Sequence, residues 1–343
     1  MSLQIAIITI LLFKMSDSLL DHALDERKSA PLRNTWQRAQ SAFGTKDRFQ
    51  KAALKAVSRE AGCPKAKHVS VLKEFIQNDY NKFEEFVVVC HALSPWSEKV
   101  TTCCKAIVAI LVLLQTGPPV SDHAYEFVNH YLASIRDEWA KRDMFLYQFS
   151  LVLTQRLSFL QEHGAFKGHF NLSTMSSNGL SLPQLDTHSS VSVLSQLLSY
   201  QGMLLNLINQ GIKNQQSSEY LRQKERETVK SALFPLYEDA YCTYVACLGI
   251  LQFIRSRASS GTLAAAQSTV EVMTELFHEQ FSLLRGIRRT LSDILSTNSI
   301  GNSYGTLEHD LSKLPENFPL NAEGSTAPNT KSSTASGALS ISH

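Results

Sequence analysis

Residues 46–69 read KDRFQKAALKAVSREAGCPKAKHV, and this stretch predicts two helices joined by a turn. Across residues 46–61, apolar side chains recur on one helical face and basic side chains recur on the opposite face at i, i+3, i+7 and i+11. Those basic side chains are Arg48, Lys51, Lys55 and Arg59. Gly62 is suited to end a helix, and Pro64 is suited to begin one. We therefore expect the first helix to run to Ala61 and the second to begin after Pro64.

Helical periodicity continues along the chain, and the alternation typical of strands persists nowhere. The sequence thus predicts an all-α protein. Short connections between helices favour a stacked superhelix, an α-solenoid of about nine to eleven helices, over a closed bundle. No repeat of fixed period is present, which argues against tetratricopeptide or ankyrin arrays. Besides residues 46–61, the predicted helices span residues 69–79, 82–93, 97–116, 121–136, 140–163, 190–210, 217–258 and 262–297.

The predicted helical domain covers residues 33–318, between two ends that are expected to be unstructured. Residues 164–190 are rich in Gly, Ser and polar side chains and predict a long loop. Residues 319–343 lack apolar content and predict a disordered tail. Residues 1–32 are predicted to be an extension with an apolar run, Ile5–Phe13, that is shorter than the ~20 residues needed to span a bilayer. This run is open to three interpretations: an upstream extension without a structural role, a membrane-inserting helix or a cleaved signal peptide.

Positive charge is concentrated in one part of the chain. The whole sequence has a net charge of +2, but the segment from Arg33 to His68 holds nine Lys and Arg residues against only Asp47 and Glu60. That segment therefore carries +7, and the remainder carries −5. A local basic field on a nearly neutral protein indicates a specific anionic partner surface.

The motifs that usually carry catalysis or bind metals are missing from the sequence. It contains no glycine-rich phosphate loop, no dinucleotide-binding glycine motif, no nucleophile elbow and no HExxH metal motif. His123 and His130 can share a helix face, but no third metal ligand accompanies them. We expect neither an enzyme nor a metal or cofactor site.

Six cysteines are present, and their spacing matches neither a redox pair nor a zinc site. Several lie in apolar helical runs, where a free thiol acts as a small apolar side chain. This usage predicts a reducing, cytosolic compartment. The six are Cys63, Cys90, Cys103, Cys104, Cys242 and Cys247.

The candidate binding residues lie on both sides of the predicted turn. Lys51 and Lys55 are one helical turn apart and share a face. Lys65, Lys67 and His68 begin the next helix, where free backbone N–H groups and the helix dipole already favour an anion. If the two helices fold back on each other, both clusters meet in one patch. Such a patch suits a polyphosphate, as found on a charged lipid head group.

This arrangement resembles the phosphoinositide-binding signature of the ANTH domain family, [KG]-A-[TI], six residues, then [PA]-K-x-[KR]-H. The chain has Lys55-Ala56-Val57, then SREAGC, then Pro64-Lys65-Ala66-Lys67-His68. The spacing is kept, and Val57 is the one departure. Valine has the shape of threonine and falls on the apolar face, so lipid binding is not put in doubt. Looser similarities extend the resemblance to residues 96–119, 145–163, 232–254 and 307–319.

The resemblance implies a right-handed helical superhelix and a cytoplasmic protein that is peripheral on the plasma membrane, in clathrin-coated pits and vesicles. The implied lipid is phosphatidylinositol 4,5-bisphosphate, and the implied role is in clathrin coat assembly and cargo selection. Lys55, Lys65, Lys67 and His68 would contact the head-group phosphates, with Lys51 in support. Clathrin and vesicle SNARE proteins are implied as partners by the resemblance alone, because the tail lacks the short motifs that bind clathrin and its adaptors.

Other interpretations of the same residues stay open. A basic patch also attracts nucleic acid, but this patch is compact and few aromatic side chains interleave with it, so we expect no nucleic-acid partner. A helical protein-interaction scaffold of the ENTH or VHS type, without clathrin binding, is a second alternative. The third is the huntingtin-interacting, actin-linking branch of the same family, which HGAFKGHFNL at residues 163–172 slightly resembles.

Overall fold

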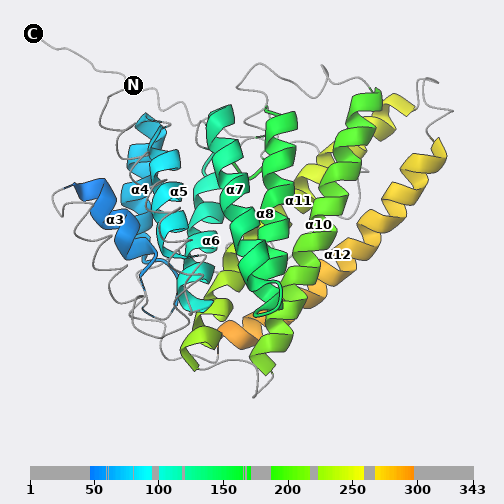
Figure 1. Ribbon diagram of the computed structural model, residues 1–343. Helices are drawn as coiled ribbons and strands as arrows, with labels where there is room; N and C mark the ends of the chain where they lie inside the picture. The colour runs from blue at the N-terminus through cyan, green and yellow to red at the C-terminus, as the bar shows by residue number, and fades with distance from the viewer. Residues whose placement is uncertain are drawn as a thin grey trace, which may run out of the picture. The chain divides into compact units, whose positions relative to one another are not determined.

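The computed structural model of the protein consists of helices and turns, with no strand among the residues that it describes (Figure 1). The predicted all-α fold is confirmed. Both ends that were predicted to be unstructured, and most of the loop predicted over residues 164–190, lie outside the described residues. Those residues all belong to one compact unit, Met1–His309. They are 47–58, 60, 62–79, 81–94, 100–117, 120–164, 166, 168–170, 187–216, 223–258 and 267–296.

Nine helices make up this described part, and those between residues 66 and 162 lie close to their predicted bounds. The first helix ends five residues before the predicted Ala61. The last three depart by five or six residues at one end: one ends at Gln216 and not at 210, and the others begin at Gln223 and Gln267 and not at 217 and 262. Along the chain they are α3 (Arg48–Ala56), α4 (Ala66–Asn78), α5 (Asn81–Leu93), α6 (Val100–Leu114), α7 (Asp122–Trp139), α8 (Met144–Glu162), α10 (Thr187–Gln216), α11 (Gln223–Ala258) and α12 (Gln267–Ser296).

Helix α6 forms the centre of the core, because each of its 15 residues is buried. Its sequence, VTTCCKAIVAILVLL, is apolar on nearly every face, as expected for a helix enclosed by others. It packs against α3, α4 and α5 on the N-terminal side of the chain and against α8 and α11 on the C-terminal side. The single charged side chain of α6, Lys105, is therefore held inside the protein.

Most consecutive helices pack against each other, such as α3 with α4, α7 with α8 and α10 with α11, while α5 also packs against α7 and α6 against α8. Figure 1 shows the helices following one another in chain order from α3 to α10, with α12 running obliquely beside α10. Local caps fix where helices begin: Ser121 Oγ accepts a hydrogen bond from the Ala124 N–H at 3.1 Å. Asp143 Oδ1 likewise accepts from the Leu146 N–H at 2.9 Å. Such caps satisfy amides that have no partner within the helix.

Helix α10 is long and apolar enough to cross a membrane when judged by length and composition alone. In the fold it packs against α8, α11 and α12. At Gly211 a Cβ would lie 2.5 Å from Leu233 Cδ2 of α11, so glycine permits the close approach of the two helices. The apolar side chains of α10 thus serve the core of the helical stack.

A buried ion pair connects three of these helices. Arg156 of α8 donates from Nη1 to both carboxylate oxygens of Asp239 of α11 at 2.6 Å, and both side chains are inaccessible to solvent. Tyr200 of α10 also donates to this carboxylate. Gln115, at the end of α6, donates to it at 3.3 Å. The charge of Asp239 is therefore surrounded by donors from separate elements.

We predict that Asp239→Ala will lower the free energy of unfolding by about 3–5 kcal/mol, because it leaves the Arg156 charge buried without its partner. Urea unfolding followed by circular dichroism measures the change. Glu74→Ala is the control, since it breaks an exposed pair with Arg48 at 3.0 Å and should cost less than about 1 kcal/mol. Equal losses in the two variants would contradict a special role for the buried pair.

Candidate functional site

The turn between α3 and α4 begins earlier than the sequence predicts. Helix α3 ends at Ala56, and the Ser58 N–H reaches only to the Lys55 carbonyl, at 3.3 Å. The predicted extension to Ala61 is wrong, and Gly62 is not the residue that ends this helix. Gly62 instead lies inside the turn with φ at +87°, a left-handed conformation that favours glycine. The chain thus crosses from α3 to α4 in an irregular turn, which the structure describes at residues 57, 58, 60 and 62–65.

Helix α11 holds the middle of this turn. The Gly62 N–H donates to Thr228 Oγ1 at 3.2 Å, and the Cys63 thiol donates to the Ser231 carbonyl at 3.0 Å. That carbonyl is free to accept because Pro235, four residues later in α11, has no N–H to bond to it. Burial raises the pKa of Cys63 to about 11, so the thiol keeps the proton that it donates.

Helix α6 holds the beginning of the turn through its buried lysine. Lys105 Nζ donates to Ser58 Oγ and to the Glu60 carbonyl, each at 3.2 Å. These two acceptors carry no full charge, so the ammonium group is hydrogen-bonded in the turn without an ion-pair partner there. Burial lowers the pKa of Lys105 to about 8. Hydrogen bonds to α6 and α11 therefore fix the path of this turn. The sequence of the turn alone does not.

The first turn of α4 presents cations at an open helix end. Lys65 is the N-cap residue, and its carbonyl accepts from the His68 N–H at 2.9 Å. No side chain caps this helix, and its first turn contains no acidic residue. Lys67 is exposed and His68 is half-buried. The positive end of the helix dipole and three basic side chains therefore coincide.

Lys55, Lys65 and Lys67 lie close enough for their charges to act on His68. Burial lowers the pKa of His68, and the positive charges of Lys67, Lys65 and Lys55 lower it further. Lys55 is exposed near the end of α3, so α3 and α4 both contribute to one cationic surface. Lys51 is also exposed, one turn earlier on α3, but it is not among the charges that shift His68. We call Lys55, Lys65, Lys67 and His68 the cationic cluster.

Glu60 is a member of this surface that the sequence prediction did not use. Its carboxylate Oε2 lies 2.7 Å from Lys65 Nζ, and its side chain is 57% exposed. The hydrogen bond and charge of Lys65, followed by the charges of Lys105 and Lys55, lower the pKa of Glu60. In the sequence, this role of Glu60 is signalled by its position within the six-residue spacer of the signature. From the sequence alone, Glu60 only lowers the net charge of the basic segment.

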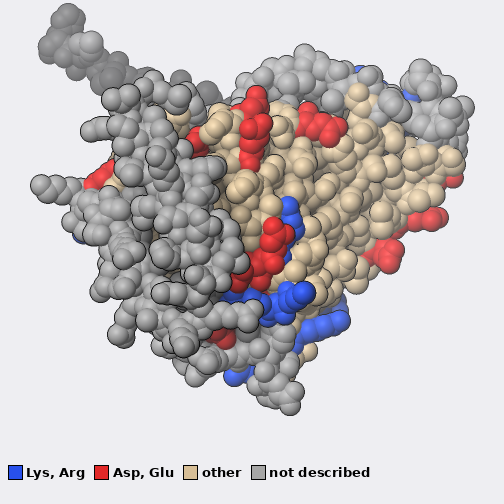
Figure 2. All heavy atoms as spheres, in the orientation of Figure 1, with Lys and Arg blue, Asp and Glu red and all other residues tan. Residues whose placement is uncertain are grey.

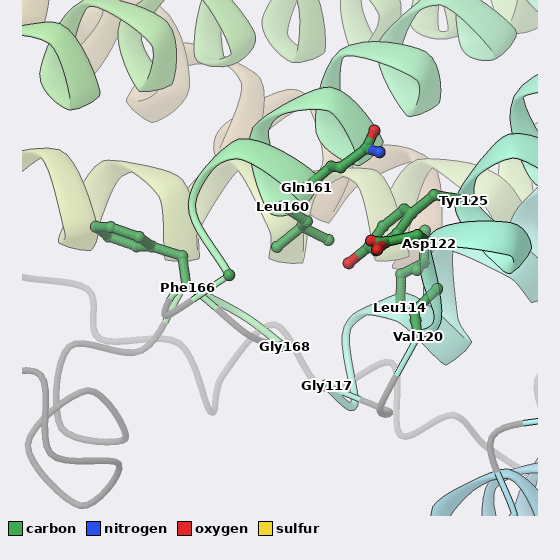
Figure 3. A pocket seen from close by; sticks show the side chains of 10 residues that line it. Leu114, Gly117, Val120, Asp122, Tyr125, Leu160, Gln161, Phe166 and Gly168 are labelled. Carbon is green, nitrogen blue, oxygen red and sulfur yellow. The ribbon is translucent and has the colours of Figure 1, made fainter.

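The described residues contain no group of three or more His, Cys, Asp and Glu side chains placed to hold a metal ion. His123 instead lies beside Glu84, at 3.1 Å between Nδ1 and Oε2. A pocket of about 290 Å³ lies between the α6–α7 connection and the end of α8 (Figure 3). The described residues of its lining combine apolar side chains and glycines with Asp122, Tyr125 and Gln161, and none of these described residues is basic.

Charge is distributed unevenly on the face of the molecule that Figure 2 displays. Lys and Arg side chains gather toward its lower edge, whereas Asp and Glu side chains lie above them and along the α12 side. A fold with little net charge thus still presents a strong local field.

Comparisons with known proteins agree with this geometry. The ANTH domain family model matches residues 48–286, which is well over half of the chain. Among solved structures, the ENTH domain from epsin-2 in complex with phosphatidylinositol 4,5-bisphosphate is similar, with a TM-score of 0.50 and 17% sequence identity. The alignment covers 74% of this chain and 95% of that domain, and at this identity it shows the fold alone. No curated protein sequence matches this chain.

Fold and surface together define an all-α protein with a cationic turn between its first two described helices. The chain belongs to the ANTH domain family. This family comprises phosphoinositide-binding endocytic adaptors.

We predict that Lys105→Met will remove a specific pH dependence of stability. Between pH 8 and ~10.4 the unfolded wild-type chain binds a proton that the folded chain does not, because Lys105 titrates near 8 only when it is buried. The free energy of unfolding of the wild type, relative to that of the variant, should therefore rise by about 2–3 kcal/mol as the pH increases through this window. Urea unfolding at several pH values under reducing conditions measures it. A difference that stays constant with pH would contradict the prediction.

Proposed function

We propose that this protein is a peripheral membrane adaptor that binds phosphatidylinositol 4,5-bisphosphate through the cationic cluster. Lys55, Lys65, Lys67 and His68 contact the head-group phosphates, and Lys51 adds longer-range attraction. The adaptor is cytoplasmic and is recruited to the plasma membrane at sites of clathrin-mediated endocytosis. Its roles toward clathrin and vesicle SNARE proteins follow from family membership.

One observation carries this proposal: basic side chains from the end of α3 and the start of α4 gather beside an uncapped helix N-terminus. Burial lowers the pKa of His68, and the charges of Lys67, Lys65 and Lys55 lower it further, which supports this convergence. Like charges gathered in this way repel, and an anion relieves the repulsion. A head group with several phosphates can meet the lysines and the α4 amides together.

The membrane context suits the modest strength of such contacts. Each basic residue near an anionic membrane surface contributes on the order of 1 kcal/mol, so four or five of them give salt-sensitive recruitment. The solved ENTH domain that shares this fold was captured with the same lipid, which supports the choice of ligand. It does not by itself assign the binding residues of this chain.

We predict that replacing Lys65 and Lys67 with Glu will abolish co-sedimentation with vesicles that contain phosphatidylinositol 4,5-bisphosphate. Removing two cations and adding two anions should lower the affinity by at least about thirtyfold. Wild-type binding should also fall steeply with added salt, because charges are screened over ~10 Å at 0.1 M. Circular dichroism checks that the helical content is unchanged.

The matched control for this experiment reverses two exposed cations elsewhere, Lys213 of α10 and Arg289 of α12. It changes the net charge by the same amount but should retain most of the binding. Equal loss in both double variants would contradict a specific site. Equal binding to neutral vesicles would assign the membrane contact to the Ile5–Phe13 run, and comparable affinity for duplex DNA would favour a nucleic-acid partner.

We predict a second signature from His68, because bound phosphates should raise the lowered pKa of this side chain. The complex then takes up a proton, so binding should strengthen as the pH falls through the region below ~6.5. His68→Gln should lose this part of the pH dependence. Vesicle binding of both proteins between pH 8 and pH 5.5 measures it, and the comparison cancels titration of the lipid itself. Parallel pH profiles for the two proteins would show that His68 does not contact the head group.

A further inference from the structure

The unliganded cationic cluster already contains an anion, the carboxylate of Glu60. Its contact with Lys65 Nζ, at 2.7 Å, is the one ion pair that the cluster makes within the described residues. The charge of Lys55 also lowers the pKa of Glu60, and the charge of Glu60 acts on His68. A lipid phosphate that binds Lys65 must therefore take a place that the protein itself occupies.

We infer that Glu60 is a built-in competitor for the head-group site, whose carboxylate must leave Lys65 before a phosphate can bind there. This inference rests on the proposed function and names a residue that sets the strength of head-group binding. Glu60 acts against binding, in contrast to the residues of the cationic cluster.

The structure provides a simple route for this exchange. The Glu60 backbone is held in place, because its carbonyl accepts from Lys105 Nζ at 3.2 Å. Its side chain is 57% exposed and, within the described part of the chain, pairs with Lys65 alone, so rotation about its own bonds carries the carboxylate into water. The turn, and with it the spacing of Lys55 and Lys65, need not move.

Competition lowers the apparent affinity of every ligand that needs Lys65. An exposed ion pair contributes little to stability, typically below about 1 kcal/mol, so its loss on binding is small but measurable. A phosphate group carries about −1.5 to −2 at neutral pH and displaces a carboxylate of charge −1 from the same ammonium group. Glu60 thus weakens recruitment without preventing it.

The test compares wild type with Glu60→Gln in co-sedimentation with phosphatidylcholine vesicles that contain phosphatidylinositol 4,5-bisphosphate. Glu60→Gln should bind about two- to fivefold more tightly. Glu74→Gln is the matched control: Glu74 pairs with Arg48 across α3 and α4, and its side chain is 55% exposed. It makes the same change of charge and loses a comparable ion pair, but outside the cationic cluster, and should bind nearly as wild type does.

A double-mutant cycle separates competition from a general gain of positive charge. Lys65→Met lowers the affinity, and adding Glu60→Gln to that background should give no further gain, because the pair is already broken. An equal gain with and without Lys65, or an equal gain from Glu74→Gln, overturns the inference. Weaker binding by Glu60→Gln also overturns it, since Glu60 then supports the turn.

Failure of the proposed function gives a different result in the same assay. Wild-type protein that does not co-sediment with these vesicles overturns both the function and this inference. Wild-type protein that does co-sediment, with Glu60→Gln equal to its control, overturns only the inference. Thermal unfolding of each variant confirms that the fold is intact before affinities are compared.

Discussion

The hydrogen bonds that Lys105 makes from inside the core determine the shape of the turn between α3 and α4. An ammonium group is costly to bury, and the lowered pKa of Lys105 records that cost. Its partners, Ser58 Oγ and the Glu60 carbonyl, both belong to the turn. The buried charge therefore binds the turn to α6, and α11 completes the attachment through Thr228 and the Ser231 carbonyl. The surface outside depends on this internal scaffold, because Lys55 and Lys65 lie at the two ends of the segment that it holds.

The arrangement also explains how the protein tolerates a group of like charges on one surface. Lys55, Lys65 and Lys67 stay solvated to differing degrees, and Glu60 partly neutralises them. The desolvated member, His68, responds by favouring its neutral form. Several positive charges therefore lie close together, and a ligand with several negative charges can stabilise them. The deep core uses a different arrangement, since the Arg156 and Asp239 charges are fully enclosed and paired with each other, and Tyr200 also donates to Asp239.

Membership of the ANTH family and the similarity to an ENTH domain at 17% identity show how little sequence a helical stack needs to retain. What the fold requires is a pattern: a helix such as α6 that is apolar on every face, flanked by amphipathic helices. Binding residues can vary on such a scaffold, because turns at the helix ends carry them. For this reason the lipid-binding role that we propose for this chain depends on its own residues at the α3–α4 turn.

The sequence by itself determined the class of fold, most helix bounds and the residues of the cationic cluster. Helical periodicity and the fixed spacing of Lys55 from Pro64-Lys65-Ala66-Lys67-His68 are local signals, and local signals survive in a sequence. Tertiary structure decided where α3 ends. It also decided the hydrogen bonds that Lys105, Thr228 and Ser231 make to the turn, and the pairing of Glu60 with Lys65. Thr228 and Ser231 lie more than 160 residues from the turn that they hold. Their contacts depend on packing between distant helices, which no local pattern specifies.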